Sequence, residues 1–441
     1  MSQAQISAVA ARTREQRAWY LYDWANSAFA TTVVTLFLGP YLTALAKTGA
    51  DSHGMIRPLG ITVDARSYWS YLVSLSVILQ VVLMPVVGAI ADASRRKRMC
   101  LAVAAGVGSL ATMSMILLTG QRFLLGGALF LIANASFGAS IVVYNSFLPE
   151  IATPEERDRV SSRGWGVGYL GGGVLLALNL LLYSNAEGLG WSGSLAVRVS
   201  LLSAGVWWAV FTIPSLLGLR DHRGTGVHKV QIVAQLTQSL RELQSLPVTA
   251  TFLLAFLLYN DAIQAVLALS AQFGSDELHM PTGQLTLAIL MVQFVAFAGA
   301  IAFQWLAALI SAQRALVASL VLWTAVLFYI YASVRSAKGF FIAAAVVAAV
   351  MGGSQSLSRS LFAQMIPKGK EAEYFSLYEI SDKGTSWVSP LVFGLALQYT
   401  GSYRLSILSL AVFFVLGLLI LLRVDVARGT AAVREVPVQR S

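Results

Sequence analysis

Charged residues are scarce in this chain. Asp, Glu, Lys and Arg together make up 12% of the 441 residues, and that is about half the share usual in soluble domains. Hydrophobic residues reach 57%, which is more apolar surface than one packed aqueous domain can bury. We therefore expect an integral membrane protein whose solvent is the lipid bilayer.

Reactive and metal-ligating side chains are also few. Cys100 is the only cysteine, which excludes an internal disulfide and a cysteine-built metal cluster. His53, His222, His228 and His279 fall in loop-like segments without the spacing of a zinc-binding helix. No stretch resembles a phosphate-binding loop, so ATP is not the expected direct energy source. We expect no metal and no cofactor, and a lipid-modifying membrane enzyme is disfavoured because the chain supplies no suitable nucleophile.

Long apolar stretches recur along the chain with short polar breaks between them. Each is long enough for a membrane-spanning helix. They predict an all-α polytopic membrane protein with two groups of six spans, near residues 17–45, 67–91, 99–119, 123–147, 163–183 and 195–217, then 248–271, 284–309, 315–334, 339–362, 374–398 and 404–423. This organisation gives an N-terminal half (1–217), a linker (218–246) and a C-terminal half with a short tail (247–441). The linker has apolar residues at helical spacing, which fits an amphipathic interfacial helix or a plain connector.

The basic residues are distributed unevenly between the predicted loops. Of the 31 Lys and Arg residues, 21 fall on the side that holds both termini and 8 on the other side. Because basic loops stay in the cytoplasm, both termini are predicted to be cytoplasmic. The same bias explains the net charge of +10 without any nucleic-acid partner.

Two short segments repeat between the halves. Residues 21–28 (LYDWANSA) and 258–265 (LYNDAIQA) share a pattern in the first and seventh spans. A second match joins the ends of the fourth and tenth spans, at Ser146 and Ser360. Parallel repeats of six spans are typical of major facilitator transporters, which bind the solute near the membrane midplane.

The repeated segments carry polar residues inside predicted spans. A carboxylate at the centre of a span costs about 2.5–3.5 kcal/mol, so it normally has a partner or a task. Two interpretations remain open, a solute-binding cavity between the two spans or hydrogen bonds between helices. The candidate solute-binding residues are Tyr22, Asp23, Asn26 and Ser27 in the first span, and Tyr259, Asn260, Asp261 and Gln264 in the seventh. Further candidates of the same kind are Tyr144, Asn145 and Gln293.

A second group of charges falls in the tenth and eleventh spans. Glu379 and Lys383 are four residues apart, so they can pair on one helix face. Asp382 points elsewhere, and Arg359 is its available cation. The group is predicted either to couple protonation to helix movement or to serve as a structural ion pair.

The fifth predicted span begins with closely spaced glycines. Gly164, Gly168 and Gly172 recur every four residues. This spacing predicts a face on which another helix packs closely.

The loop between the second and third spans reads GAIADASRRKR and resembles the major facilitator signature G-x-x-x-D-[R/K]-x-G-[R/K]-[R/K]. It departs from that signature at Ala93 and Arg95. The corresponding loop of the second half, LAALISAQR, has no acid. The loop is predicted to be a conformational latch or only a basic cytoplasmic loop, and its latch residues would be Gly88, Asp92, Arg96 and Lys97.

Three longer segments resemble one branch of that superfamily. WYLYDWANSAF, LYNDAIQ and SRSLFAQMIPKGKEAEYFSLYEISDKGTSW are similar to segments of the vacuolar amino-acid effluxer family, which includes autophagy-linked exporters and bacterial relatives. The resemblance implies a major facilitator fold and export or exchange of small solutes, amino acids above all. It also implies a multi-pass protein of a bacterial inner membrane. Protons are the expected coupling ion, and we expect a monomer; a drug or sugar efflux carrier and a non-transporting sensor remain alternatives.

Overall fold

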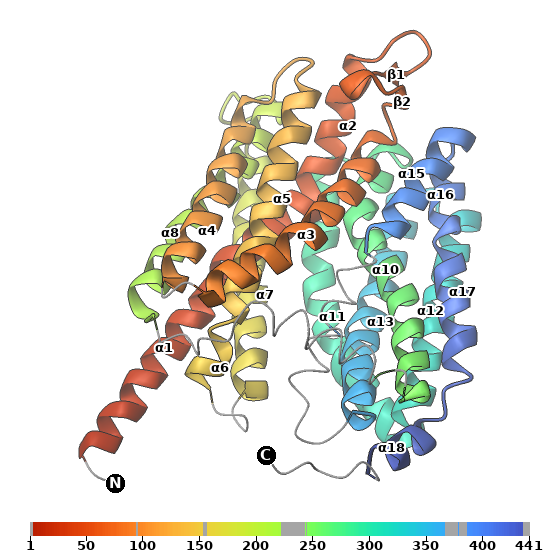
Figure 1. Ribbon diagram of the computed structural model, residues 1–441. Coiled ribbons are helices and arrows are strands. Elements are labelled where there is room, and N and C mark those ends of the chain that lie inside the picture. The colour runs from red at the N-terminus through yellow and green to blue at the C-terminus, as the bar shows by residue number, and fades with distance from the viewer. Residues whose placement is uncertain are drawn as a thin grey trace. The chain divides into compact units, whose positions relative to one another are not determined.

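The computed structural model describes residues 3–93, 96–152, 157–221, 243, 245–366, 378 and 386–434. The predicted interfacial helix of the linker therefore falls almost entirely outside the described residues. The chain divides into two compact units, Met1–Lys229 and Val230–Ser441. Each unit is described separately below (Figure 1).

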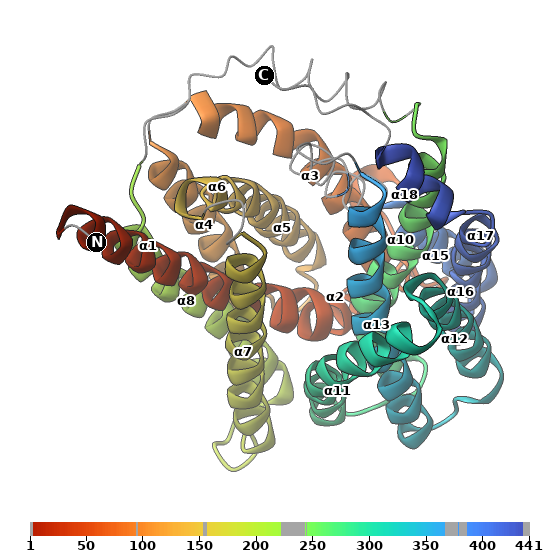
Figure 2. The same cartoon turned by 90° about the horizontal axis from the view of Figure 1, so that it is seen from below.

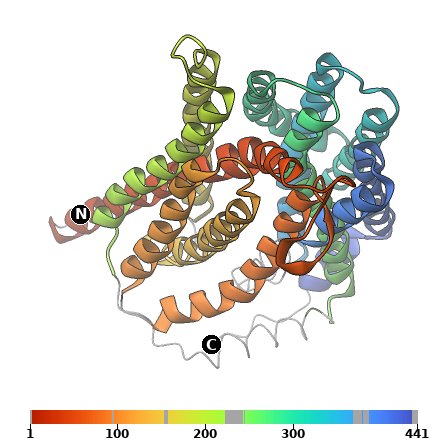
Figure 3. The same ribbon diagram turned by 90° about the horizontal axis from the view of Figure 1, so that it is seen from above.

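The first unit consists of helices and one small hairpin. Its α-helices are α1 (Gln3–Ala28), α2 (Leu38–Thr48), α3 (Tyr68–Ala93), α4 (Lys97–Ser114), α5 (Phe123–Asn145), α6 (Leu148–Ile151), α7 (Arg157–Ser184) and α8 (Gly193–Gly218). A π-helix, η1 (Phe29–Phe37), joins α1 to α2, and the short 3₁₀ turns are η2 (Pro58–Gly60) and η3 (Met115–Leu117). Strands β1 (Met55–Ile56) and β2 (Val63–Asp64) pair antiparallel and lie beyond the end of α2 (Figures 1 and 3).

All the secondary structure described in the second unit is helical. Its helices are α10 (Pro247–Asp276), α11 (Thr282–Ile310), α12 (Ala312–Ser333), α13 (Ala337–Gln364), α15 (Val388–Thr400), α16 (Tyr403–Ser409), α17 (Ala411–Leu421) and α18 (Val426–Arg434).

The predicted class of an all-α polytopic membrane protein is confirmed. Eleven segments of the described chain are long and apolar enough to cross a membrane. Their ends differ from the predicted ones by up to five residues, the largest differences lying at Arg12 and Asp276. Of the eleventh predicted span, 374–398, only residue 378 and residues 386–398 are described, and the latter contain the shorter apolar helix α15.

The helices of the two units pack in the same pairs. In the first unit α1 packs against α7 and α8, α5 against α3 and α4, and α4 against α8 (Figure 2). The corresponding contacts of the second unit join α10 to α15 and α17, α13 to α11 and α12, and α12 to α17. The internal repeat seen in the sequence is therefore also a repeat of helix packing within each half.

Several helices begin and end at residues suited to those positions. The side chains of Ser192 and Ser402 accept hydrogen bonds from the first turns of α8 and α16. Such serine caps satisfy backbone donors that have no partner within the helix. Gly401 ends α15 with φ 65°, a conformation that glycine adopts without strain.

An arginine ties the last span of each unit to the end of the third. Arg198 of α8 donates to the carbonyl of Ile116 in η3, at 3.0 Å. In the second unit Arg404 of α16 pairs with Glu277, with 2.6 Å from Nε to Oε1. The same guanidinium donates to the carbonyl groups of Ile330 and Tyr331, in the last turn of α12, and of Val334, just after it.

The π-helical segment interrupts the first span just after the polar repeat. Thr31 Oγ1 donates to the carbonyl of Ser27, and Thr35 Oγ1 donates to that of Ala30. Pro40 follows within α2 and lacks a backbone donor. Both effects disturb the regular α-helical ladder, and π segments are frequent beside functional sites.

Candidate functional site

The polar centre of the first unit is the contact between Asp23 and Tyr144. The Tyr144 hydroxyl on α5 donates to Asp23 Oδ2 on α1, at 2.6 Å. The Tyr144 ring stacks on Trp19, with centroids 4.3 Å apart, and Trp19 Nε1 donates to the Tyr144 carbonyl at 3.0 Å. Stacking and two hydrogen bonds therefore fix the tyrosine, and the tyrosine in turn holds the carboxyl group.

The glycine face of α7 lies against the same side of α1. A Cβ atom on Gly164 would come within 2.6 Å of the Trp19 ring and would also collide with Asp23 Oδ2. On Gly168 it would lie 3.3 Å from the Asp23 carbonyl. Ser27 Oγ donates to the Gly168 carbonyl at 2.7 Å, and a Cβ on Gly172 would lie 3.3 Å from the Ser27 carbonyl. Only helices without side chains at these positions approach so closely.

Tyr22 and Asn26 are enclosed within the first unit. Tyr22 has 0% of its surface exposed, and Trp208 of α8 donates to its hydroxyl at 3.4 Å. Its ring lies 5.0 Å from that of Tyr144. Asn26 is also buried. The observed contacts of Tyr22 are those of a positioning residue, and its predicted contact with a solute stays a prediction.

The second unit repeats the contact between its first and fourth spans. Tyr259 of α10 is 1% exposed, and its hydroxyl lies 2.5 Å from Ser358 Oγ on α13. Tyr22 and Tyr259 are equivalent in the first sequence repeat. Tyr144 and Ser358 are equivalent in the second, because each stands two residues before the matched serine. The two repeats of the sequence thus meet in space within each half.

The carboxyl group of the second unit is that of Asp261, which is 2% exposed. Its Oδ2 accepts a hydrogen bond from the backbone N–H of Ser389 at 3.0 Å, in the first turn of α15. The positive end of a helix dipole favours a negative charge there. Asp261 Oδ1 is buried and has no hydrogen-bond partner within the described residues.

Neither carboxyl group is paired with a cation among the described residues. The contacts of Asp23 are with a hydroxyl, and those of Asp261 are with a backbone amide. An acid buried without a cation binds a proton or attracts a positively charged solute. Within the described chain, no cluster of three His, Cys, Asp or Glu side chains is placed to hold a metal ion.

The remaining predicted solute-binding residues take varied positions. Asn145 is exposed on α5, Asn260 is buried on α10, and Gln264 and Gln293 are half-buried. The predicted coupling group is only partly observable, because Glu379, Asp382 and Lys383 lie outside the described residues. Arg359 is exposed on α13.

The predicted latch loop has one well-defined ion pair. Lys97, at the start of α4, pairs with Glu150 of α6, with 2.7 Å between Nζ and Oε1. Gly88 on α3 faces α5, where an added Cβ would lie 3.3 Å from Val142. Arg96 is exposed, and the side chain of Asp92 lies outside the described residues. The sequence patterns identified Lys97 but not its partner.

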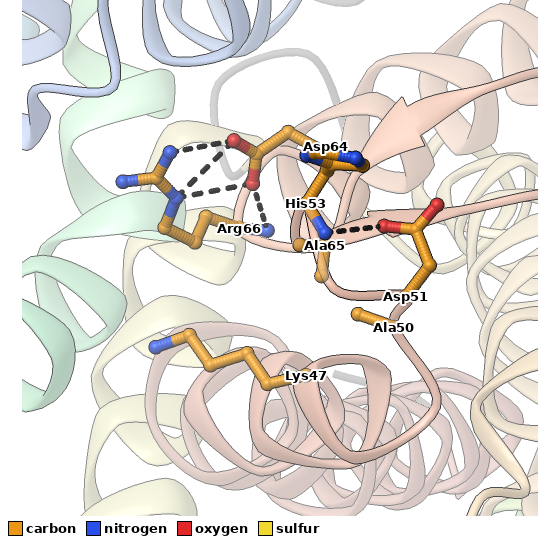
Figure 4. A pocket seen from close by; sticks show the side chains of 8 residues that line it. Lys47, Ala50, Asp51, His53, Asp64, Ala65 and Arg66 are labelled. Carbon is orange, nitrogen blue, oxygen red and sulfur yellow. Dashed lines mark hydrogen bonds and ion pairs between the residues drawn. The ribbon is translucent and has the colours of Figure 1, made fainter.

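A polar pocket of about 240 Å³ lies between α2 and the hairpin (Figure 4). Arg66 and Asp64 form a bidentate ion pair in its wall, with 2.6 Å from Nη2 to Oδ2. Asp51 Oδ1 accepts hydrogen bonds from the backbone N–H groups of Met55 and His53. These two bonds lower the pKa of the Asp51 carboxyl below its usual value. The carboxylates of this pocket are thus engaged in holding the loop.

The repeated helix packing and the membrane spans define a multi-pass membrane transporter of the major facilitator type. The nucleoside transporter NupG has the same fold, with a TM-score of 0.68 at 12% identity, covering 93% of this chain and 99% of that one. The MFS-type transporter YxiO of Bacillus subtilis is 30% identical over 93% of this chain and 94% of its own.

The family follows from the whole length of the sequence. The family model "Vacuole effluxer Atg22 like" matches residues 11–434. Autophagy-related protein 22-1 of Penicillium rubens is 27% identical over 94% of this chain and 90% of its own. The chain belongs to the Atg22-like vacuole effluxer family, as the resemblance predicted, and is a transporter rather than an enzyme.

Sequence patterns missed several residues of these contacts, including Trp208, which donates to Tyr22. Trp19, Ser358, Ser389 and Glu150 were also not among the candidates. Trp19 and Ser358 lie inside the segments that carry the family resemblance, which was an available signal. Ser389 acts through its backbone N–H, so its residue type gives no signal.

Proposed function

We propose that the protein is a secondary active transporter that moves small polar solutes, amino acids above all, by alternating access. The observation that carries the proposal is the pair of acids Asp23 and Asp261, one in each half, neither paired with a cation among the described residues. An ammonium group or a proton would supply the missing positive charge. The family's effluxer name supports movement out of a compartment.

The transport cycle and its location are part of the same proposal. In this cycle, proton binding at Asp23 and Asp261 drives exchange between the open states. The YxiO relative of Bacillus subtilis and the charge bias of the loops support a bacterial plasma membrane with both termini cytoplasmic, and a monomeric protein is part of the proposal.

Counterflow of labelled amino acids in proteoliposomes tests the proposal. Asp23→Asn and Asp261→Asn should each lower the rate about tenfold or more, because each removes a charge-assisted contact. Glu187→Gln is the matched control, since Glu187 is exposed in a loop. Sugars and cationic drugs are the competing solutes. Counterflow of a sugar alone, or unchanged rates in both Asn variants, would overturn the assignment.

Proton coupling is measured separately. With coupling, an imposed pH gradient should change the rate of the wild-type protein, and the Asn variants should lose that response. Equal rates with and without a gradient would remove proton coupling and leave solute exchange intact.

A further inference from the structure

A pocket at the ends of α4 and α8 differs in chemistry from the surroundings of Asp23 and Asp261. It has a volume of about 490 Å³ and lies wholly within the first unit. Its lining combines cationic and apolar side chains with one carboxylate, and comprises Arg96, Arg98, Met99, Ala102, Leu216 and Asp221. Since α4 and α8 are membrane spans, their ends lie at the membrane–water interface.

Arg96, Lys97 and Arg98, at the start of α4, have different roles. Lys97 points inward and is neutralised by Glu150. Arg96 and Arg98, on either side of it, line the pocket. Arg98 Nε is buried without a hydrogen-bond partner among the described residues. A buried guanidinium donor left unsatisfied is costly, so an acceptor from outside the chain is favoured there.

The carboxylate in the lining does not cancel the arginines. Asp221 Oδ1 accepts the backbone N–H of Arg98 at 2.9 Å, so it caps the first turn of α4. With two guanidinium groups and one carboxylate, the lining is net positive. This balance favours a phosphate group.

The apolar part of the pocket continues along the two helices. Met99 is 57% exposed and begins a stripe of exposed apolar side chains on α4. The neighbouring helix α8 carries a matching stripe. The side chains nearest the pocket are Val103 and Val107 on α4 and Val210, Ile213 and Leu217 on α8. Acyl chains fit such a surface, whereas a free phosphate ion gains nothing from it.

We propose that this pocket binds an anionic phospholipid, with its phosphate at Arg96 and Arg98 and its acyl chains along α4 and α8. Basic pockets between membrane helices recognise lipid headgroups in this way. The lipid would brace α4 against α8. Neither the transported solute nor the acids Asp23 and Asp261 take part.

Native mass spectrometry of the purified full-length protein tests the proposal. The probes are phosphatidylglycerol, phosphatidylcholine with the same acyl chains, and inorganic phosphate. Phosphatidylglycerol should remain bound at lower concentration than phosphatidylcholine, and phosphate should not compete with it. Arg98→Gln should weaken phosphatidylglycerol binding about fivefold, the effect of one interfacial cation, and Arg98→Lys should retain most of the binding.

The control variant is Arg423→Gln, since Arg423 is exposed at the end of a span in the other unit. It removes the same charge and should leave binding unchanged. Equal losses in Arg98→Gln and Arg423→Gln would show diffuse attraction and overturn the site. Equal binding of the two lipids would overturn the charge argument, and full competition by phosphate would overturn the lipid assignment.

Discussion

The hydrogen bond between Tyr144 and Asp23 allows a quantitative test of the candidate site. Tyr144→Phe removes the hydroxyl donor that lies 2.6 Å from Asp23 Oδ2. It keeps the ring that stacks on Trp19 and the carbonyl that accepts from Trp19 Nε1. A hydrogen bond to a charged group contributes about 1.5–3 kcal/mol, and one between neutral groups about 0.5–1.5 kcal/mol. We expect Tyr144→Phe to lower the free energy of unfolding by an amount in the higher of these two ranges, because the Asp23 carboxyl group is left without its partner.

The assay is equilibrium unfolding in mixed micelles, combined with a double-mutant cycle. Tyr144→Phe, Asp23→Ala and the double variant together isolate the pairwise energy, because alanine removes the acceptor whereas asparagine would still accept the hydrogen bond. A coupling energy above about 1.5 kcal/mol indicates an ionised Asp23, and about 1 kcal/mol a neutral one. Tyr399→Phe is the control, because Tyr399 is 81% exposed and should change stability by no more than about 0.5 kcal/mol. A coupling energy near zero would refute the claim that Tyr144 positions Asp23.

Three further predictions follow from other contacts. Gly164→Ala should destabilise the first unit and slow transport, because its Cβ meets Trp19 at 2.6 Å; Gly166→Ala, which meets nothing within 4 Å, should instead stabilise by about 1 kcal/mol. Thermal unfolding distinguishes the two, and equal melting temperatures would contradict the packing argument. Arg404→Gln should cost about 2–4 kcal/mol, since it leaves Glu277 and three carbonyls without their donor; unchanged unfolding would show that the contact is dispensable. The lowered pKa of Asp51 means that its stabilisation of the hairpin is present above about pH 4 and is lost as pH falls further. Hydrogen exchange should therefore show that the hairpin amides open more often in acid. Asp51→Asn should show the same extra opening already at neutral pH. Protection of these amides that does not change with pH would contradict the prediction.

The spans were predictable because the bilayer imposes one strong rule. A helix must be apolar for about 20 residues to cross the hydrocarbon core, and that rule is visible in composition alone. The π-helical segment Phe29–Phe37 was not predicted, since it depends on threonine hydroxyls that donate to backbone carbonyls and on Pro40, which lacks a backbone donor. Some helices continue beyond the apolar core of the membrane, so hydropathy predicts that they end too early. Helix α10, which ends at Asp276, is one of them.

The candidate site was predictable in its residue types but not in its contacts. Buried acids are costly in a membrane, so Asp23 and Asp261 stand out from the sequence. Tyr144 reaches Asp23 from 121 residues away, and Asp261 is held by a backbone amide of Ser389 that has no residue-type signature. The repeat gave the one long-range clue, because its two matched segments meet within each half.

The sequence by itself determined the solvent of this protein, its helical class, its two-fold internal repeat and its family. These properties can be predicted from composition and residue order, because the bilayer imposes the same requirement on every span and the repeat recurs in both halves. Only the tertiary structure decided which polar groups are satisfied. It enclosed Tyr22 and Tyr259 as supports within their own halves, matched Lys97 with Glu150, and left Arg98 Nε without a partner in the described chain. The physical reason is that a hydrogen bond depends on a few tenths of an ångström between distant residues, and packing alone sets that distance.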